Sequence, residues 1–327
     1  MSMISRFGPV AFFGLFLLLQ HSSLPGQDPA RPSQQAAGGQ LPASISDQTY
    51  RVNVDLINVF CSAWNKDTKS FVTHLAQGDF FVYEDGVRQD IRNFAREASL
   101  PLTIALLVDT SQSVAPKLKF EQEAATNFFY TVLKPNDRAM LVQFDSSVNM
   151  VQDFTNEINK LAKQIRTMRA AGNTALFDAI VKTCDEKLIR ETGRKTIVIL
   201  SDGEDSASTE TFDRAREMAI NAEATIFSIS ISRGGFFGTG GDTRQGDRVL
   251  KQLAEETGGK ALFPFQVEEL EAAFREISQE LRSQYNLGYV SSNPKRNGGY
   301  RKIEIRLADK NLKLNYRKGY FAPAGGQ

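Results

Sequence analysis

The chain has 327 residues, of which 41% are hydrophobic and 24% are charged. This composition is typical of a globular protein and excludes a collagen, a coiled coil and a chain that is disordered throughout. Lysine and arginine together number 39 against 38 for aspartate and glutamate, so the formal net charge of +1 disfavours a dedicated nucleic-acid-binding protein. The two cysteines, Cys61 and Cys184, are too few for a disulfide-dense scaffold or a thiolate zinc site, and we expect no disulfide between them.

The N-terminus is predicted to be an export signal. Arg6 precedes an apolar run from Pro9 to Leu19, which suits a signal-peptide core and is too short to span a bilayer. An uncleaved membrane anchor is the alternative. We expect residues 1–26 to be removed and the mature chain, which has no further candidate membrane span, to be periplasmic, at the cell surface or extracellular.

A disordered linker and a short β segment are expected next. Residues 27–49 contain proline, glutamine, glycine and serine but no aromatic residue, so they cannot bury enough apolar surface to offset chain entropy. Residues 50–99 show period-two alternation, which is typical of strands. Asp85-Gly86 predicts a tight type I′ turn, with residues 91–94 as the return strand of the hairpin. The expected strands are 51–59, 71–73, 80–83 and 91–94.

Residues 100–282 alternate between apolar strands and amphipathic helices, which predicts an α/β domain with a mostly parallel, helix-covered sheet. The continuous apolar runs 102–108 and 196–200 are typical of strands that are buried on both faces. The other expected strands are 139–144, 148–154, 224–231 and 261–263, with 148–154 returning along the sheet edge. The expected helices are 117–133, 156–168, 174–189, 209–221, 248–256 and 267–282.

The β pattern returns in residues 283–323, with expected strands at 285–290, 300–307 and 312–316. This segment and residues 50–99 are each too short to form an independent core. We therefore predict that the two flanks combine into one β-sandwich, into which the α/β domain is inserted. Basic residues concentrate between Lys295 and Lys318; we expect a solvated sheet face there, with binding to an anionic surface as the alternative.

Polar side chains follow the two fully apolar strands. Asp109, Ser111 and Ser113 come after the first of these strands, and Asp202 follows the second. Thr174 opens a helix after a loop between them. Ligands bind at the carboxyl ends of strands in a doubly wound sheet, so we expect these side chains to converge. An all-oxygen set of two carboxylates and three hydroxyls suits Mg²⁺, with Mn²⁺ or Ca²⁺ as possible substitutes.

The pattern Asp109, Ser111, Ser113, Thr174 and Asp202 resembles the metal-ion-dependent adhesion site of von Willebrand factor type A (VWA) domains. The resemblance covers residues 100–282 and implies a six-stranded doubly wound sheet with one antiparallel edge. It also implies three hydroxyl ligands, with the two aspartates acting directly or through water. The flanking segments 79–86 and 316–320 resemble a bacterial secreted family of VWA-related proteins.

The sequence thus predicts a secreted binding module and not an enzyme. The cation is expected to capture an Asp or Glu side chain of a partner protein, and the oligomeric state is left open. One alternative is a structural cell-envelope protein in which the metal only stabilises the fold. The other is a metal-assisted hydrolase, for which only Glu204 and Asp205 are candidate bases near the metal. No phosphate-binding loop or nucleophile elbow is present.

Several neighbouring residues have structural interpretations. We expect Glu204 and Asp205 to form a solvated acidic loop, and Asp178 to support the start of its helix rather than the metal. The glycine-rich segment 234–241 contains Phe236 and Phe237, which are a candidate contact for a partner.

Overall fold

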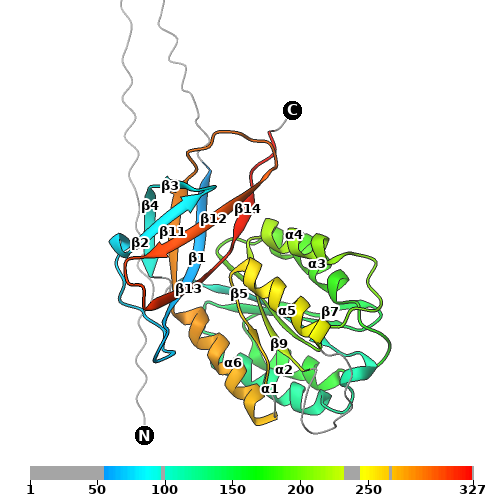
Figure 1. Ribbon diagram of the computed structural model, residues 1–327. Helices are drawn as coiled ribbons and strands as arrows, with labels where there is room; N and C mark the ends of the chain where they lie inside the picture. Colours follow the sequence, from blue (N-terminus) through cyan, green and yellow to red (C-terminus); the bar gives the residue numbers. More distant parts are fainter. Residues whose placement is uncertain (1–54, 97–99, 232–243, 265–266, 326–327) are drawn as a thin grey trace, which may run out of the picture. The chain divides into compact units, whose positions relative to one another are not determined.

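A computed structural model describes residues 55–96, 100–231, 244–264 and 267–325 of the chain (Figure 1). All of them belong to one compact unit that spans Asn53–Gln327. The predicted signal peptide, the linker and the segment 234–241 lie outside the described residues. Among the helices that the structure describes, none has the length and apolar character needed to cross a membrane.

A six-stranded sheet forms the centre of the α/β part, in the order β10-β9-β8-β5-β6-β7. Its strands run parallel except for β7, which pairs antiparallel with β6 at one edge. The predicted fold class is therefore confirmed. The strands are β5 (Leu102–Asp109), β6 (Arg138–Phe144), β7 (Val148–Thr155), β8 (Arg194–Ser201), β9 (Ala224–Ser230) and β10 (Ala261–Leu262).

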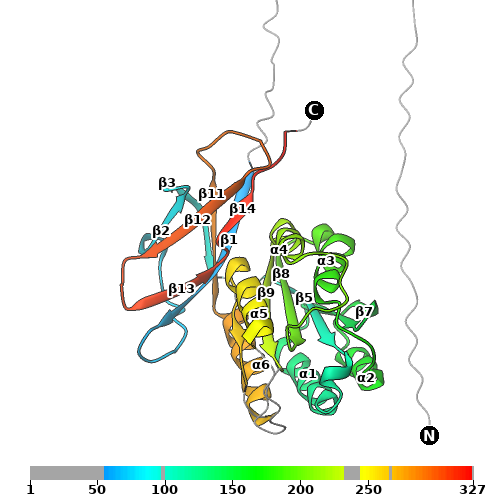
Figure 2. The ribbon, with the colours of Figure 1, turned by 45° about the vertical axis from the view of Figure 1, so that its right-hand side comes forward.

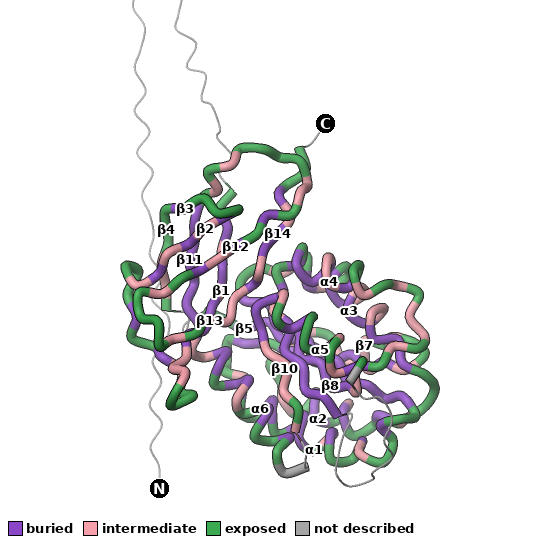
Figure 3. The backbone as a smooth tube through the Cα atoms, viewed as in Figure 1, coloured by how far each residue is buried: buried purple, intermediate pink, exposed green. Residues whose placement is uncertain are grey.

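Helices cover both faces of this sheet (Figure 2). Residues of α1, α2 and α6 pack on one face, and residues of α3, α4 and α5 pack on the other. Every residue of β5 and β8 is buried as a result, which explains their continuous apolar runs (Figure 3). The helices are α1 (Leu118–Val132), α2 (Ile158–Thr167), α3 (Leu176–Glu186), α4 (Phe212–Asn221), α5 (Arg244–Thr257) and α6 (Val267–Arg282), with 3₁₀ turns at η1 (Gln77–Asp79), η2 (Gln112–Val114) and η3 (Leu188–Arg190).

The flanking segments form two four-stranded sheets, in the orders β13-β1-β11-β4 and β14-β12-β2-β3. Each sheet takes two strands from each end of the chain, and β11 lies between β1 and β4. The predicted pairing of the two flanks is confirmed, because neither flank alone supplies a complete sheet. The strands are β1 (Leu56–Asn65), β2 (Phe80–Glu84), β3 (Val87–Gln89), β4 (Ile91–Arg96), β11 (Gln284–Val290), β12 (Tyr300–Leu307), β13 (Leu312–Tyr316) and β14 (Gly319–Phe321).

Two expectations about these strands were wrong, and one strand was missed. The return strand of the hairpin is β3, because Asp85 and Gly86 both have positive φ and a two-residue turn restarts the strand at once. The expected return strand, residues 91–94, belongs to β4, which pairs with β11 in the other sheet. Residues 71–73 make only an isolated bridge to β1, and the strand β14 was not foreseen.

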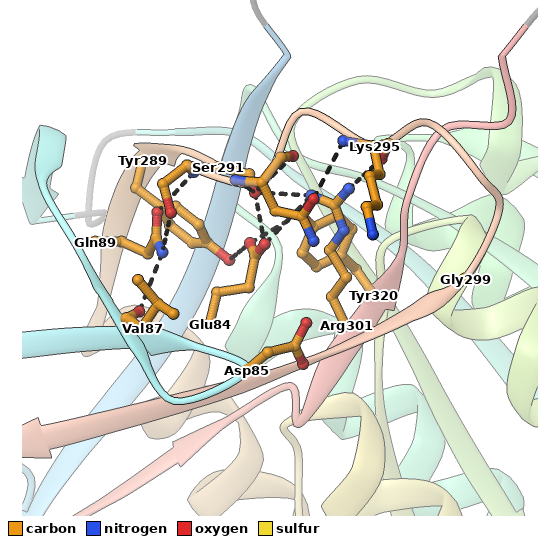
Figure 4. Close-up of polar contacts among 12 residues, drawn as sticks. Glu84, Asp85, Val87, Gln89, Tyr289, Ser291, Lys295, Gly299, Arg301 and Tyr320 are labelled. Carbon is orange, nitrogen blue, oxygen red and sulfur yellow. Dashed lines mark hydrogen bonds and ion pairs between the residues drawn. The ribbon is translucent and has the colours of Figure 1, made fainter.

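A buried polar network joins strands of the two sheets (Figure 4). Glu84 and Arg301 are buried and form an ion pair at 3.2 Å, and the hydroxyl groups of Tyr289 and Tyr320 each donate to Glu84 Oε2 at 2.9 Å. Arg317 is likewise buried, so two members of the basic C-terminal segment are interior groups and not part of a solvated face. Satisfied hydrogen bonds offset the cost of burying the charges of Glu84 and Arg301.

The two connections between the sandwich and the inserted domain meet at Arg194, the first residue of β8. Its fully buried guanidinium donates to the carbonyl groups of Leu100 and Leu281, and to Gln284 Oε1 at 2.8 Å. The chain enters the domain at the first of these residues and leaves it at the other two. One side chain thus binds the incoming and outgoing connections together.

A second ion pair supports the same junction. Arg282 at the end of α6 pairs with Asp137, which is buried. The other carboxylate oxygen of Asp137 accepts a hydrogen bond from the backbone nitrogen of Leu102 at 2.7 Å. The last helix is therefore linked to the start of the first strand of the domain.

We predict that Arg194→Met lowers the free energy of unfolding by about 2–4 kcal/mol, because buried acceptors lose their donor. Chemical denaturation of the full chain measures this change. Arg190→Met is the matched control, since Arg190 is exposed on η3 and should change stability by less than about 0.5 kcal/mol. Equal stabilities of the two variants would contradict the role assigned to Arg194.

Candidate metal-binding site

The carboxyl ends of β5 and β8 bring two aspartates to one edge of the sheet. The two strands are adjacent and parallel, with Val108 opposite Leu200. Asp109 is the last residue of β5, and Asp202 follows the last residue of β8. The predicted adjacency of these strands is confirmed, and it places both carboxylates where a doubly wound sheet binds ligands.

Direct hydrogen bonds join four of the five predicted site residues. The backbone nitrogen of Ser111 donates to Asp109 Oδ1 at 2.8 Å, and the hydroxyl oxygens of Ser111 and Ser113 lie 3.0 Å apart. The Ser113 hydroxyl then donates to Asp202 Oδ2 at 2.8 Å. The structure therefore gathers these four side chains into one continuous cluster of oxygen atoms.

Thr174 is held near this cluster by backbone contacts. The backbone nitrogen of Gln112 donates to the carbonyl of Gly172 at 3.0 Å, which ties the Thr174 loop to the loop after β5. The backbone nitrogen of Ser206 donates to the Thr174 carbonyl at 2.9 Å, which ties it to the loop after β8. Within the described part of the chain, no hydrogen bond joins the Thr174 hydroxyl to the other four residues.

Burial makes Asp109 an unusual carboxylate. Loss of water around it raises its pKa to about 6, although hydrogen bonds from Ser201 and Ser111 act in the opposite direction. The charge of Asp202 raises the pKa further. Ser201, which donates to Asp109 Oδ2 at 2.6 Å, was missed from the sequence. A cation beside Asp109 favours its ionised form, so the electrostatics of the cluster suit cation binding.

The donor set fits a hard divalent cation. It contains carboxylate and hydroxyl oxygens only, which are the ligand types of Mg²⁺, Mn²⁺ and Ca²⁺. In residues 55–96, 100–231, 244–264 and 267–325, no three His, Cys, Asp or Glu side chains form a group that could hold a metal ion. The predicted set instead combines two carboxylates with three neutral hydroxyl groups.

The acidic residues near the cluster have specific structural roles. Asp205 accepts hydrogen bonds from the backbone nitrogens of Leu176 and Phe177 at 2.8 and 3.3 Å, so it caps the start of α3 from another loop. Asp178, which was expected to support the start of its own helix, instead accepts from the backbone nitrogen of Glu210 at 2.8 Å. The expectation of a solvated acidic loop holds for the exposed Glu204 but was wrong for Asp205.

Sequence analysis also missed Glu121, which is buried on α1. The sequence did indicate its burial, because Glu121 occupies an apolar position of the helical pattern, three residues after Leu118 and four before Ala125. A charged residue at such a position marks either a buried ion pair or a functional group.

We predict that Asp205→Ala lowers the free energy of unfolding by about 1 kcal/mol, as loss of a helix cap does. Glu204→Ala is the matched control, since its side chain is exposed on the same loop and should leave stability unchanged. Thermal and denaturant unfolding of both variants in EDTA measures the difference. An equal loss in both variants would show that Asp205 does not act as a cap.

Residues 104–204 match the family model described as von Willebrand factor type A domain. The matched segment includes all five predicted site residues, and the inserted α/β domain is a VWA domain. A search of curated protein sequences gives no match to the chain.

Solved structures with this fold include three of interest. A von Willebrand factor type A protein from Catenulispora acidiphila is 13% identical, with a TM-score of 0.47, and the match covers 85% of this chain and 76% of that one. The vWF domain of the type V pili tip protein Mfa5 from Porphyromonas gingivalis is 16% identical, with a TM-score of 0.47, covering 55% and 94%. Proximal thread matrix protein 1 from the mussel byssus, with a zinc-occupied MIDAS motif, is 14% identical, with a TM-score of 0.49, covering 62% and 50%.

Proposed function

We propose that this chain is an exported binding module whose VWA domain holds a divalent cation and captures an acidic side chain of a partner protein. The observation that carries the proposal is the hydrogen-bonded cluster of Asp109, Ser111, Ser113 and Asp202 at the carboxyl edge of the sheet. The presence of a VWA domain supports a protein-interaction or adhesion module. Mg²⁺ is the ion that the donor set suits best, with Mn²⁺ or Ca²⁺ as substitutes.

The proposed ligands are Asp109, Ser111, Ser113, Thr174 and Asp202. When bound, the cation supplies a positive centre for an incoming carboxylate. The five residues contribute only two negative charges, so an outside carboxylate meets little repulsion at the loaded site. The loops after β5 and β8 position these residues, because both are anchored on adjacent buried strands.

The proposed organisation of the chain follows the sequence boundaries. Residues 1–26 are a signal peptide and residues 27–49 a linker, which place the folded part outside the cytoplasm. Residues 50–99 and 283–323 form the sandwich, and residues 100–282 form the VWA domain. In this arrangement the sandwich supports the binding domain.

Binding rather than catalysis is the proposed role. Of the two candidate bases for a hydrolase, Asp205 is engaged as the cap of α3, which leaves only Glu204. The one histidine among the described residues is His74, which lies in the sandwich segment between β1 and η1 and not in the VWA domain. The site therefore offers a poor set of groups for proton transfer.

The first prediction for this site concerns the cation. Mg²⁺ or Mn²⁺ at about 100 times its Kd should add about 2.7 kcal/mol of stability, because it binds only the folded state. Asp109→Asn should abolish the resulting rise in Tm. The matched control is Asp145→Asn at the end of the neighbouring β6, which should keep the rise. A Tm that changes neither on addition of these cations nor on addition of EDTA would contradict the site assignment.

The second prediction concerns the partner. Thr174→Asp should keep or tighten cation binding but weaken partner binding about tenfold, because a third carboxylate repels an incoming one. Ser111→Ala should weaken both, since a hydroxyl ligand is lost. Titration calorimetry measures the cation, and pull-down from an extracellular fraction in Mg²⁺ and then in EDTA measures the partner.

The pull-down in EDTA and a separate turnover assay distinguish the proposal from its alternatives. Partner capture that survives EDTA would show that the cation is not the contact and would favour the structural role. Turnover of phosphoester or peptide substrates that depends on Mg²⁺ would favour the hydrolase.

A further inference from the structure

Four lysines gather around Trp64 at one end of the sandwich, and we name them the lysine cluster. Lys66 and Lys69 belong to the connection that follows β1. Lys310 lies in the turn before β13, and Lys313 lies on β13 itself. The two strands pair antiparallel, with Trp64 opposite Lys313. The tertiary structure therefore adds two lysines of the N-terminal flank to the basic segment of the C-terminal flank.

Hydrogen bonds hold these lysines close together. The backbone nitrogen of Lys66 donates to the Asn311 carbonyl at 3.0 Å, and its ammonium group donates to the Lys310 carbonyl. The Lys69 ammonium group donates to the Lys66 carbonyl at 2.5 Å. The two connections are thus tied to each other, although about 240 residues separate them in the chain.

Two of the ammonium groups lie over the indole ring of Trp64. The nitrogens of Lys69 and Lys313 are 5.5 and 5.4 Å from the ring centroid, and each contact is a favourable cation–π interaction. The two positive charges nevertheless repel each other, because they share one ring. A bound anion would relieve that repulsion.

The lysine cluster has an excess of positive charge. The same two connections contain Asp67 and Asp309, so four positive charges are opposed by two negative ones. Within the part of the chain that the structure describes, none of the four lysines forms an ion pair. The Asp309 carboxylate instead accepts a hydrogen bond from the backbone nitrogen of Asn311 at 2.8 Å. The exposed Lys69 and Lys310 are therefore available to a negatively charged ligand, as is Lys313.

Protection of the sheet edge explains only part of this arrangement. The strand β13 is an edge strand, and lysines on such strands discourage pairing with other chains. That role accounts for Lys313. It does not account for Lys66 and Lys69, because they follow β1, which is an interior strand of the same sheet. Binding of an anionic ligand accounts for the whole cluster.

The composition of the surface favours an acidic polysaccharide over a protein or a membrane. Lysine is depleted in protein–protein interfaces, where aromatic and arginine side chains supply most of the binding energy. None of the exposed large hydrophobic side chains of the described residues lies in segments 64–70 and 308–313, so the cluster has no apolar group to insert into a bilayer. Exposed hydroxyl and amide groups of Thr68, Ser70 and Asn311 suit hydrogen bonding to a sugar.

We propose that the lysine cluster is a second binding site of this chain, which takes an acidic polysaccharide. Carboxylate or sulfate groups of the polymer contact Lys69, Lys310 and Lys313, while Lys66 holds the two connections together. The site lies entirely in the sandwich and needs no divalent cation. The inference therefore goes beyond the proposed function and does not depend on it.

The test measures binding of the full chain to polygalacturonate by calorimetry, with neutral dextran as the control polymer. Binding should persist in EDTA and weaken as NaCl is raised, because salt screens exposed charges. Lys69→Gln/Lys313→Gln should increase the Kd about tenfold, and Lys310→Gln about threefold. The matched control, Lys134→Gln/Lys163→Gln, removes two exposed charges from the VWA domain and should change the Kd less than about twofold.

A further variant separates loss of charge from a change in folding. Lys69→Arg/Lys313→Arg keeps both positive charges and should keep the wild-type affinity for polygalacturonate. A Kd that is the same for the wild type and for Lys69→Gln/Lys313→Gln would overturn the inference. Equal weakening by the glutamine variant and by the matched control would overturn it too, because the charges of the cluster would then have no special role.

Other ligands give distinct outcomes. Wild-type protein that binds phosphatidylglycerol vesicles or polyglutamate, but not polygalacturonate or dextran sulfate, would overturn the inference in favour of a membrane or an acidic protein. Polysaccharide binding that is lost in EDTA would place the contact at the candidate metal site and would likewise overturn it. Failure of the Mg²⁺ experiments would contradict the proposed function alone, since they do not involve the lysine cluster.

Discussion

The pairing of β1 with β11 is the constraint on which the rest of the structure depends. Val59 lies opposite Leu287, so strands from opposite ends of the chain are hydrogen-bonded neighbours. The strand β4 also pairs with β11, so the α/β domain, which lies between these two strands in the chain, leaves the sandwich and returns to it at one place. Arg194 binds both connections at that place, at the start of β8. The strands then run away from the junction, so their carboxyl ends and the candidate site lie at the opposite edge of the sheet.

Contacts beyond the two connections also join the VWA domain to the sandwich. Ile220 of α4 packs in the sandwich core, and the buried Glu280 of α6 accepts hydrogen bonds from Ser62 and Asn315 at 2.5 and 2.8 Å. Arg317 of the sandwich pairs with Glu223, the residue just before β9. Helices on both faces of the central sheet are therefore attached to the sandwich. The sandwich therefore contacts the domain away from the carboxyl ends of β5 and β8.

Charge balance governs what the site can bind. In the proposed site, neutral hydroxyl groups fill positions that carboxylates would occupy in a tighter cation site, and we propose that the loaded cluster therefore keeps affinity for an outside carboxylate. The buried Asp109 has a raised pKa because water is excluded around it. A divalent cation reverses that unfavourable situation. Under the proposed function, cation binding, local stability and partner binding are therefore coupled through the same few charges.

The sequence by itself determined the α/β class, the two strands that end next to Asp109 and Asp202, and the union of the two flanks. These features follow from local periodicity and from the rule that parallel strands present their carboxyl ends at one edge. Only the tertiary structure decided that residues 91–94 join the other sheet and not the hairpin, that Asp205 caps a helix from another loop, and that Glu121 is buried. Periodicity reports which face of an element is buried, but the partner of each strand edge and polar group depends on packing between residues that are far apart in the chain.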